Sequence, residues 1–198
     1  MSERPIVNID MDGTQFDFDG RVTQVLREHG VEIVDASKDF YIANRYSDPE
    51  VVALIHDVQS AEGFFRNLEP IDGAIERWYE MIERGYGPRS CTKPLRSNLF
   101  CTAEKLAVID YYFGAKAADA AYIGRDKESQ PGIALIDDRP GMTDGREWKR
   151  IIFTQPWNTH EDDWRIQSWA DPQLWQLLAK CVERHSRITA RNSSPPLL

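Results

Sequence analysis

RPIVNIDMDGT, residues Arg4 to Thr14, is the most informative stretch of this chain. It begins with a short apolar run rich in branched residues, which predicts a buried strand that ends before Gly13. Successive side chains of a strand point to opposite faces, so Asp10 and Asp12 are expected on one side and Met11 on the other. The strand would therefore deliver two carboxylates to a single site.

Two carboxylates at such close range repel each other. For charges about 4 Å apart the repulsion is about 1 kcal/mol in water and about 4 kcal/mol at an effective dielectric near 20. A cation such as Mg²⁺ at Asp10 would relieve it, and so would a proton on Asp12, which would make this residue a general acid. The alternative is a solvated turn, because Asp-Gly is a common turn sequence.

Outward from this stretch, the chain first reads as a small helical unit and then as an alternation of helices and strands. In the helical unit, Asp48 is a suitable N-cap and Pro49 a suitable first helical residue. The later strands are expected at residues 86–92, 121–124, 132–137 and 149–154, and the later helices at residues 72–85, 102–114 and 170–185. Strands separated by helices predict an α/β fold with a parallel sheet covered on both faces. The segment before Thr92 is polar and contains a proline, which is poor material for a central strand.

A second acidic strand end repeats the arrangement of the first. In GIALIDDRPG an apolar run delivers Asp137 and Asp138. Adjacent residues face opposite sides of a strand, so only one of the two is expected to aim directly at a metal near Asp10, and periodicity does not say which. Thr92 in CTKP and Lys127 in GRDKES add a hydroxyl and an ammonium. A lone threonine or lysine is usually a surface residue, but the whole set is more specific than its members.

Composition limits the classes of function. The chain has 198 residues, 41% of them apolar, which suits one globular domain with a small insertion. Its net charge of −8 opposes binding to a nucleic-acid backbone. The three cysteines form no closely spaced metal pair, the N-terminus has no apolar signal core, and no run is long enough for a membrane helix. We therefore expect a reduced, cytoplasmic protein that binds neither nucleic acid nor membranes.

Four of these motifs together resemble those of a known superfamily. DMDGT, the threonine of CT, the lysine of RDK and the acidic pair of LIDDRP are similar, in this order, to the motifs of the haloacid dehalogenase (HAD) superfamily of phosphotransferases. DFYIANRY, GFFRNLEPIDGAIE, CTKP, YYFG and SWAD extend the likeness to its 5′(3′)-deoxyribonucleotidases. The resemblance implies a Rossmann-like three-layer sandwich with a core of residues 1–17 and 73–190 and a helical cap of residues 18–72 inserted after the first strand. The polar, proline-containing composition of residues 191–198 predicts a disordered tail.

The resemblance also implies a mechanism. Asp10 would be the nucleophile that forms an aspartyl-phosphate, and Asp12 the general acid and base. Mg²⁺ would be held by Asp10, the backbone carbonyl of Asp12, and Asp138. The substrate phosphate would be bound by Thr92 and Lys127, with Asp137 in support.

Lys93 stands where the family has a small hydroxyl residue, so it either adds a phosphate contact or points to solvent. Four further positions match the nucleobase pocket of the family, and without the resemblance they would read as the apolar side of a cap helix: Phe18, Phe40, Tyr41 and Ile42. Tyr41 stands where a tryptophan is expected. The implied substrate is a pyrimidine deoxynucleoside monophosphate, and the implied partner a second copy of the chain.

Two other hypotheses about the function remain open. The chain could be a HAD phosphatase for another small phosphomonoester, such as a sugar phosphate, although aromatic residues in the cap favour a nucleobase. It could also be a Mg²⁺-binding phospho-acceptor signalling domain, which combines an acidic cluster, a threonine and a lysine. Such domains are shorter, lack a cap and carry the phosphorylated aspartate on a middle strand.

Overall fold

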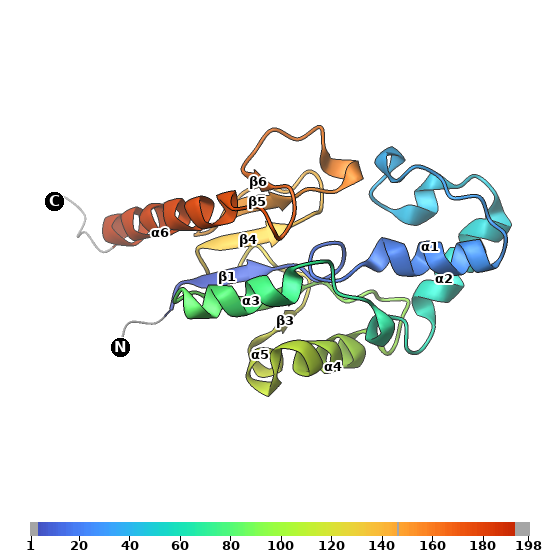
Figure 1. The fold of residues 1–198 in the computed structure, drawn as a ribbon, viewed down its shortest axis with the longest axis horizontal. Helices are drawn as coiled ribbons and strands as arrows, with labels where there is room; N and C mark the ends of the chain where they lie inside the picture. The colour runs from blue at the N-terminus through green and yellow to red at the C-terminus, as the bar shows by residue number, and fades with distance from the viewer. Residues whose placement is uncertain (1–3, 146, 193–198) are drawn as a thin grey trace.

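A computed structural model describes residues 4–145 and 147–192. Its centre is a six-stranded parallel sheet with the order β3-β2-β1-β4-β5-β6 (Figure 1). The strands are β1 (Ile6–Ile9), β2 (Gly87–Thr92), β3 (Tyr122–Ile123), β4 (Ala134–Asp137), β5 (Lys149–Phe153) and β6 (Arg165–Ile166). The predicted α/β fold with a parallel sheet is confirmed.

The helices largely follow the predicted pattern. They are α1 (Phe18–Glu28), α2 (Pro49–Ser60), α3 (Ala74–Glu83), α4 (Cys101–Phe113), α5 (Ala115–Ala120) and α6 (Gln173–Asn192), with 3₁₀ turns η1 (Ala36–Lys38), η2 (Ile42–Arg45), η3 (Phe65–Asn67) and η4 (Pro156–Asn158). The predicted N-cap of α2 is confirmed, because the Asp48 carboxylate accepts a hydrogen bond from the Glu50 amide. Neither α5 nor β6 was expected, since both are too short to show a periodic pattern.

The proline-containing segment before Thr92 is a strand after all. Pro88 lies in β2 beside Val7 of β1. On its other side β2 pairs with β3 only at Cys91 and Thr92, so at Pro88 it is an edge strand. Proline is tolerated at an edge because its missing N–H is not needed there.

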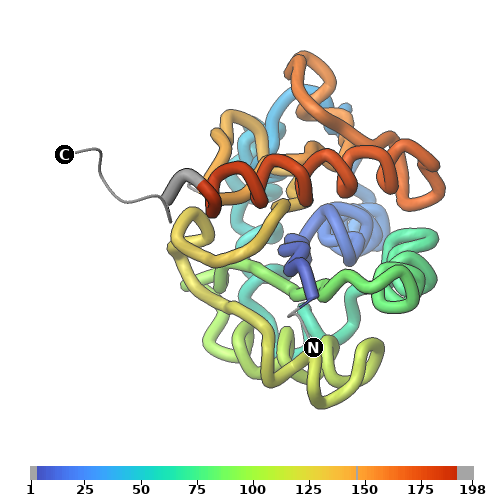
Figure 2. The backbone as a smooth tube through the Cα atoms, turned by 90° about the vertical axis from the view of Figure 1, so that its left-hand side faces the viewer, coloured from blue at the N-terminus to red at the C-terminus, as the bar shows by residue number. Residues whose placement is uncertain are grey.

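The sheet packs differently on its two faces. On one face, apolar side chains of the strands form a large core with α3, α4 and α6, including Val7, Ile136, Trp78, Ile109 and Leu178. The opposite face carries a smaller cluster of Cys91, Leu135 and Trp148. Figure 2 views the arrangement after a quarter turn, with α6 (red) running along one side of the molecule. This packing fixes β1, β2 and β4 side by side, and the site depends on their carboxyl ends.

The inserted helical region lies beyond the carboxyl ends of the strands, where α1 and α2 occupy the right-hand side of Figure 1. The outgoing and returning chain segments pair with each other at its base. Ile71 donates to the Gln15 carbonyl and Asp17 to the Glu69 carbonyl, at 2.9 and 2.8 Å. The insertion is thus tied to the sheet at the point where β1 ends.

The end of the chain differs in part from expectation. Helix α6 continues to Asn192, so the first two residues of the expected tail 191–198 are helical. Residues 193–198 lie outside the described residues. In the described part of the chain, no helix combines the length and the apolar content that crossing a membrane requires.

Candidate active site

A cleft of about 1170 Å³ lies between the carboxyl ends of the strands and the helical insertion. Every residue predicted for the site lines this cleft except Asp137, which is fully buried beneath it. From the sheet come Asp10, Asp12, Thr92, Lys93, Lys127 and Asp138, and from the insertion Phe18, Phe40, Tyr41 and Ile42. Sequence motifs separated by more than a hundred positions therefore meet in one place.

Asp10 is fixed by its backbone and by a buried lysine. Its amide donates to the Ile136 carbonyl of β4 at 2.9 Å, which places it beside Asp137. Its Oδ1 atom accepts from the Met11 amide at 2.8 Å and pairs with Lys127 Nζ at 2.7 Å. Lys127 also pairs with Asp137 at 2.8 Å. Burial alone would lower the pKa of Lys127, but the two carboxylates outweigh it and raise that pKa, so the ammonium stays charged.

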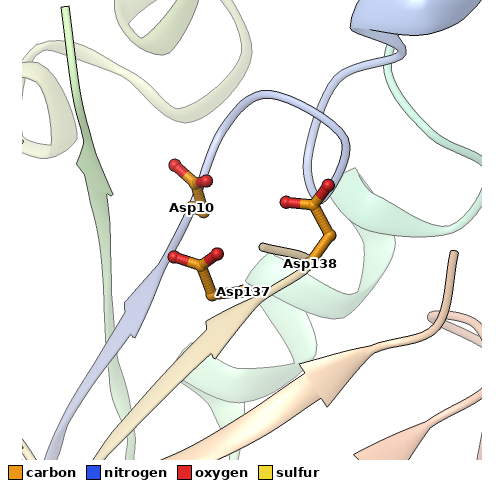
Figure 3. A group of neighbouring side chains, drawn as sticks. All are labelled: Asp10, Asp137 and Asp138. Carbon is orange, nitrogen blue, oxygen red and sulfur yellow. The ribbon is translucent and has the colours of Figure 1, made fainter. Parts of the chain in front are cut away.

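Asp10, Asp137 and Asp138 form a compact acidic group (Figure 3). Each offers a carboxylate oxygen, and these atoms lie within 4.8 Å of one another. Both residues of the acidic pair therefore lie close to Asp10, and which of them aims at a metal stays a prediction. Strand β4 ends at Asp137, so the alternation of faces no longer applies to Asp138.

Gly13 makes room for this group. Its φ of 72° lies in the left-handed region that favours glycine. A Cβ atom at this position would lie 2.3 Å from the Asp138 carboxylate, which is far too close. The Asp-Gly of the first motif is therefore required by the second motif, and the simple solvated turn does not describe it.

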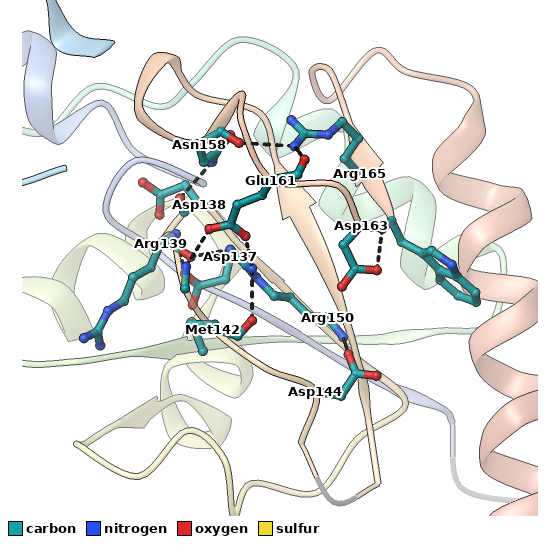
Figure 4. A network of polar contacts seen from close by, with 12 residues as sticks. Asp137, Asp138, Arg139, Met142, Asp144, Arg150, Asn158, Glu161, Asp163 and Arg165 are labelled. Atoms are coloured by element: carbon teal, nitrogen blue, oxygen red, sulfur yellow. Dashed lines mark hydrogen bonds and ion pairs between the residues drawn. The ribbon is translucent and has the colours of Figure 1, made fainter. Parts of the chain in front are cut away.

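The loop that carries Asp138 is held by a network of polar contacts (Figure 4). The Asp138 carbonyl accepts hydrogen bonds from Asn158 Nδ2 at 2.8 Å and from Trp157 Nε1 at 3.2 Å. Further along the loop, the buried Arg150 of β5 pairs with Glu161 and donates to the Met142 carbonyl. These contacts tie the loop after β4 to the next strand.

The acidic group suits a hard divalent cation. Burial raises the pKa of Asp138 well above its usual value, and Asp137 and Asp10 raise it further. Asp137 is already occupied by Lys127 and by the Arg139 amide. The carboxylates of Asp10 and Asp138 remain, and an all-oxygen donor set is what Mg²⁺ prefers.

Lys105 of α4 is a member of the site that the sequence analysis did not find. Its buried Nζ atom lies 2.6 Å from Asp12 Oδ2, 2.9 Å from Thr92 Oγ1 and 3.1 Å from the Lys93 carbonyl. The other Asp12 oxygen, Oδ1, is buried and has no hydrogen-bond partner among the described residues. Burial raises the pKa of Asp12, and Lys105 opposes this without cancelling it.

A signal for Lys105 was present in the sequence. Six positions of α4 are buried, and four of them are apolar: Cys101, Glu104, Lys105, Val108, Ile109 and Phe113. A lysine on such a mainly apolar face is rarely buried unless it is paired with an acid. The identity of that acid, Asp12, could not be read from the helix.

The predicted nucleobase residues lie on the cap side of the cleft. Phe18 packs against Phe64 with ring centroids 5.1 Å apart. Phe40 packs against Tyr41 at 4.8 Å and reaches Trp157 of the core at 6.0 Å. Tyr41 is 57% exposed, whereas Ile42 is buried. An aromatic wall therefore spans from the insertion to the core.

The cleft is more polar than the sequence indicated. The insertion contributes polar side chains that were not predicted, namely Asp19, Asn44, His56 and Gln59. The core adds Arg125 and Arg139, together with the indole of Trp157. Asn44, Arg125 and Arg139 lie inside the quoted motifs but were not expected to line the cleft, and no motif marks the others.

Comparison with known proteins identifies the family of this chain. The model of the family described as 5′ nucleotidase, deoxy (pyrimidine), cytosolic type C protein matches residues 4–182. The chain belongs to this deoxyribonucleotidase family. It is 29% identical to the mitochondrial 5′(3′)-deoxyribonucleotidase of Homo sapiens over 179 residues, covering 83% of this chain and 78% of that protein. With the human cytosolic-type 5′(3′)-deoxyribonucleotidase the identity is 29% over 182 residues, covering 83% and 89%.

The deoxyribonucleotidase chain also shares its fold with solved HAD hydrolases. A HAD family hydrolase from Deinococcus radiodurans superimposes with a TM-score of 0.54 at 14% identity, covering 92% of this chain and 98% of that one. A haloacid dehalogenase-like hydrolase from Burkholderia xenovorans gives 0.53 at 14% identity, covering 91% and 99%. The expected HAD-like fold is confirmed. The chain is a phosphomonoester hydrolase, a nucleotide phosphatase, and the signalling-domain reading is set aside.

Proposed function

We propose that this enzyme hydrolyses pyrimidine deoxyribonucleoside monophosphates to nucleoside and phosphate, with Mg²⁺ and through an aspartyl-phosphate. The observation that carries the proposal is the pairing of two aspartates with two different buried lysines. Asp10 pairs with Lys127 and Asp12 with Lys105, at 2.7 and 2.6 Å. Neighbouring carboxylates in different environments suit two different chemical roles.

In the first step Asp10 attacks the phosphorus atom. One oxygen, Oδ1, is occupied by Lys127 and the Met11 amide, while Oδ2 makes no hydrogen bond with the described residues and is free to form the bond. As the new O–P bond forms, the bond from phosphorus to the nucleoside oxygen breaks. Asp12 donates its proton to that leaving oxygen, and its raised pKa favours the protonated acid that this step needs.

In the second step a water molecule attacks the phosphorus of the aspartyl-phosphate. Asp12, now a carboxylate, accepts a proton from that water, and the O–P bond to Asp10 breaks. Phosphate is released and both aspartates return to their starting states. Lys105 donates a hydrogen bond to Thr92 Oγ1, so the Thr92 hydroxyl proton is free to be donated to a phosphoryl oxygen.

The remaining charge of the phosphate would be met by three groups. Mg²⁺ would be held by Asp10, the Asp12 carbonyl and Asp138, and when bound it would reduce the repulsion between a carboxylate nucleophile and a phosphate dianion. Lys127 is already charged and adjacent. Lys93 lines the cleft, and its ammonium makes no hydrogen bond or ion pair with the described residues, so it is available to the phosphate.

Residues 18–72 would act as a cap that covers the reaction centre and selects the substrate. Phe18, Phe40 and Tyr41 offer ring faces on which a base can stack, and Ile42 closes one side. An apolar wall does not strongly reject one extra hydroxyl, so preference for deoxyribonucleotides over ribonucleotides should stay within about 10²-fold.

A panel of substrates tests this proposal. The kcat/KM values of dUMP, dTMP and their 3′ isomers are to be compared with those of dCMP, UMP and several sugar phosphates. We expect the pyrimidine deoxynucleotides to be preferred, and activity to disappear in a chelator and return with Mg²⁺. Preference for sugar phosphates would favour the alternative phosphatase reading, and full activity in the chelator would contradict the metal-dependent mechanism. The cytoplasmic location and the homodimer stay predictions.

A further inference from the structure

Gln59 differs from the other polar side chains that the insertion contributes to the cleft. Asp19 pairs with Arg45, and Asn44 donates to Asp39 at 3.2 Å. His56 is exposed to solvent. Gln59 is only 9% exposed, lines the cleft, and its side-chain amide makes no hydrogen bond with any described residue. The Gln59 amide therefore faces the cleft without a partner among the described residues, and a bound ligand can supply one.

The position of Gln59 is well defined by its backbone. Its carbonyl accepts a hydrogen bond from Asn98 Nδ2 at 2.9 Å, and the same amide group donates to the Ala61 carbonyl at 3.0 Å. Asn98 is itself buried in the core segment before α4. Val52 and His56 lie on the same side of α2, at helical spacing, and also line the cleft. The end of α2 is thus clamped to the core with Gln59 on its cleft side.

We propose that the Gln59 side chain determines specificity by hydrogen bonding to the edge of the nucleobase. An amide presents a donor and an acceptor next to each other, which matches the paired donor and acceptor on the edge of a pyrimidine such as uracil. The aromatic wall binds the base by its face and cannot recognise its edge. Gln59 supplies the edge contact that the wall lacks. This inference rests on the proposed nucleotidase function.

Gln59→Leu tests the inference because leucine keeps a similar volume and removes both polar atoms. The kcat/KM values are to be measured for dUMP, for 2-deoxyribose 5-phosphate, which lacks a base, and for p-nitrophenyl phosphate, which lacks base and sugar. We expect kcat/KM for dUMP to fall about tenfold, because KM rises while kcat stays the same, and we expect no change for the other two substrates. Gln24→Leu, on the exposed side of α1, is the matched control and should change none of them.

A modified substrate sharpens the test. In dUMP methylated at N3 the base has lost the donor of its edge, so wild type and Gln59→Leu should hydrolyse it nearly equally. An equal fall in kcat/KM for dUMP and 2-deoxyribose 5-phosphate would show that Gln59 binds the sugar. A fall in kcat/KM for all three substrates would show that its role is structural. Either result overturns the inference. Unchanged dUMP hydrolysis in Gln59→Leu would also overturn it while leaving the nucleotidase function intact. If wild type shows no preference for dUMP over 2-deoxyribose 5-phosphate, the proposed function itself fails.

Discussion

The two ends of the cleft are built in different ways. At the phosphate end, formed by Asp10, Asp12, Thr92, Lys105 and Lys127, buried charged and polar groups contact one another within 3 Å. At the base end, formed by Phe18, Phe40, Tyr41, Ile42 and Gln59, the contacts are between ring faces and edges, and Tyr41 is more than half exposed. The phosphate end consists of two groups of ion pairs and hydrogen bonds, one around Lys127 and one around Lys105, whereas the base end is a set of separate surfaces.

This difference has a physical consequence for mutations. In a network of buried charges, removal of one member leaves its partners unpaired, so a single change has a large effect. On a surface of separate aromatic contacts, each residue contributes its own stacking area and little else. Effects should therefore be large and shared among substrates at the phosphate end, and small and specific to nucleotides at the base end.

Asp10→Asn should have the largest effect. Loss of the nucleophile is expected to lower kcat by about 10⁴-fold or more for every substrate, with the fold retained because the replacement has the same shape. Steady-state turnover and a thermal melt of the variant measure the two quantities. Asp119→Asn, on the exposed side of α5, is the control. Substantial turnover by the Asp10 variant would remove the covalent mechanism.

Asp12→Asn should have the next largest effect, and an effect that depends on the leaving group. Loss of the acid and base is expected to cost about 10² to 10⁴ in rate on dUMP. An aryl phosphate with a good leaving group needs no proton in the first step, so the loss on that substrate should be smaller. The ratio of the two losses is the measurement, and equal losses would refute the role of Asp12 as an acid.

Lys105→Met tests whether the phosphate end is a network. Lys105 is fully buried and connects Asp12 with Thr92. Its loss should lower kcat by about 10 to 100-fold on dUMP and on p-nitrophenyl phosphate alike, as for other residues that orient reacting groups. The melting temperature should fall too, because the Asp12 carboxylate loses its partner. Lys116→Met, on the exposed side of α5, is the control; the prediction fails if Lys105→Met acts on the nucleotide alone.

Tyr41→Ala should have the smallest effect and the most selective one. Stacking of a base on an aromatic side chain is worth about 1–3 kcal/mol, so KM for dUMP should rise by roughly tenfold while p-nitrophenyl phosphate is scarcely affected. Tyr111→Ala removes an exposed tyrosine of α4 that does not line the cleft and serves as the control. Equal weakening of both substrates would show that the two ends of the cleft do not act separately.

Much of the fold and the motif residues of the site could be predicted from the sequence. The strand before Asp10 and the helix after Asp48 show local patterns, because strand and helix periods are properties of neighbouring residues. The resemblance then placed Asp12, Thr92, Lys127 and Asp138 in one site, and the structure brings them together. Their roles as nucleophile, acid and ligands stay predictions until the variants are measured.

The remaining features depend on contacts between distant segments. Lys105 belongs to the site because α4 packs its buried face toward β1 and β2, and Gln59 faces the cleft because Asn98 clamps the end of α2. Asp138 approaches Asp10 because β4 ends one residue earlier. A local pattern states which side chains are apolar or charged, but the partner of a buried charge or amide is chosen by three-dimensional packing, since its stability depends on which groups replace the water that it loses.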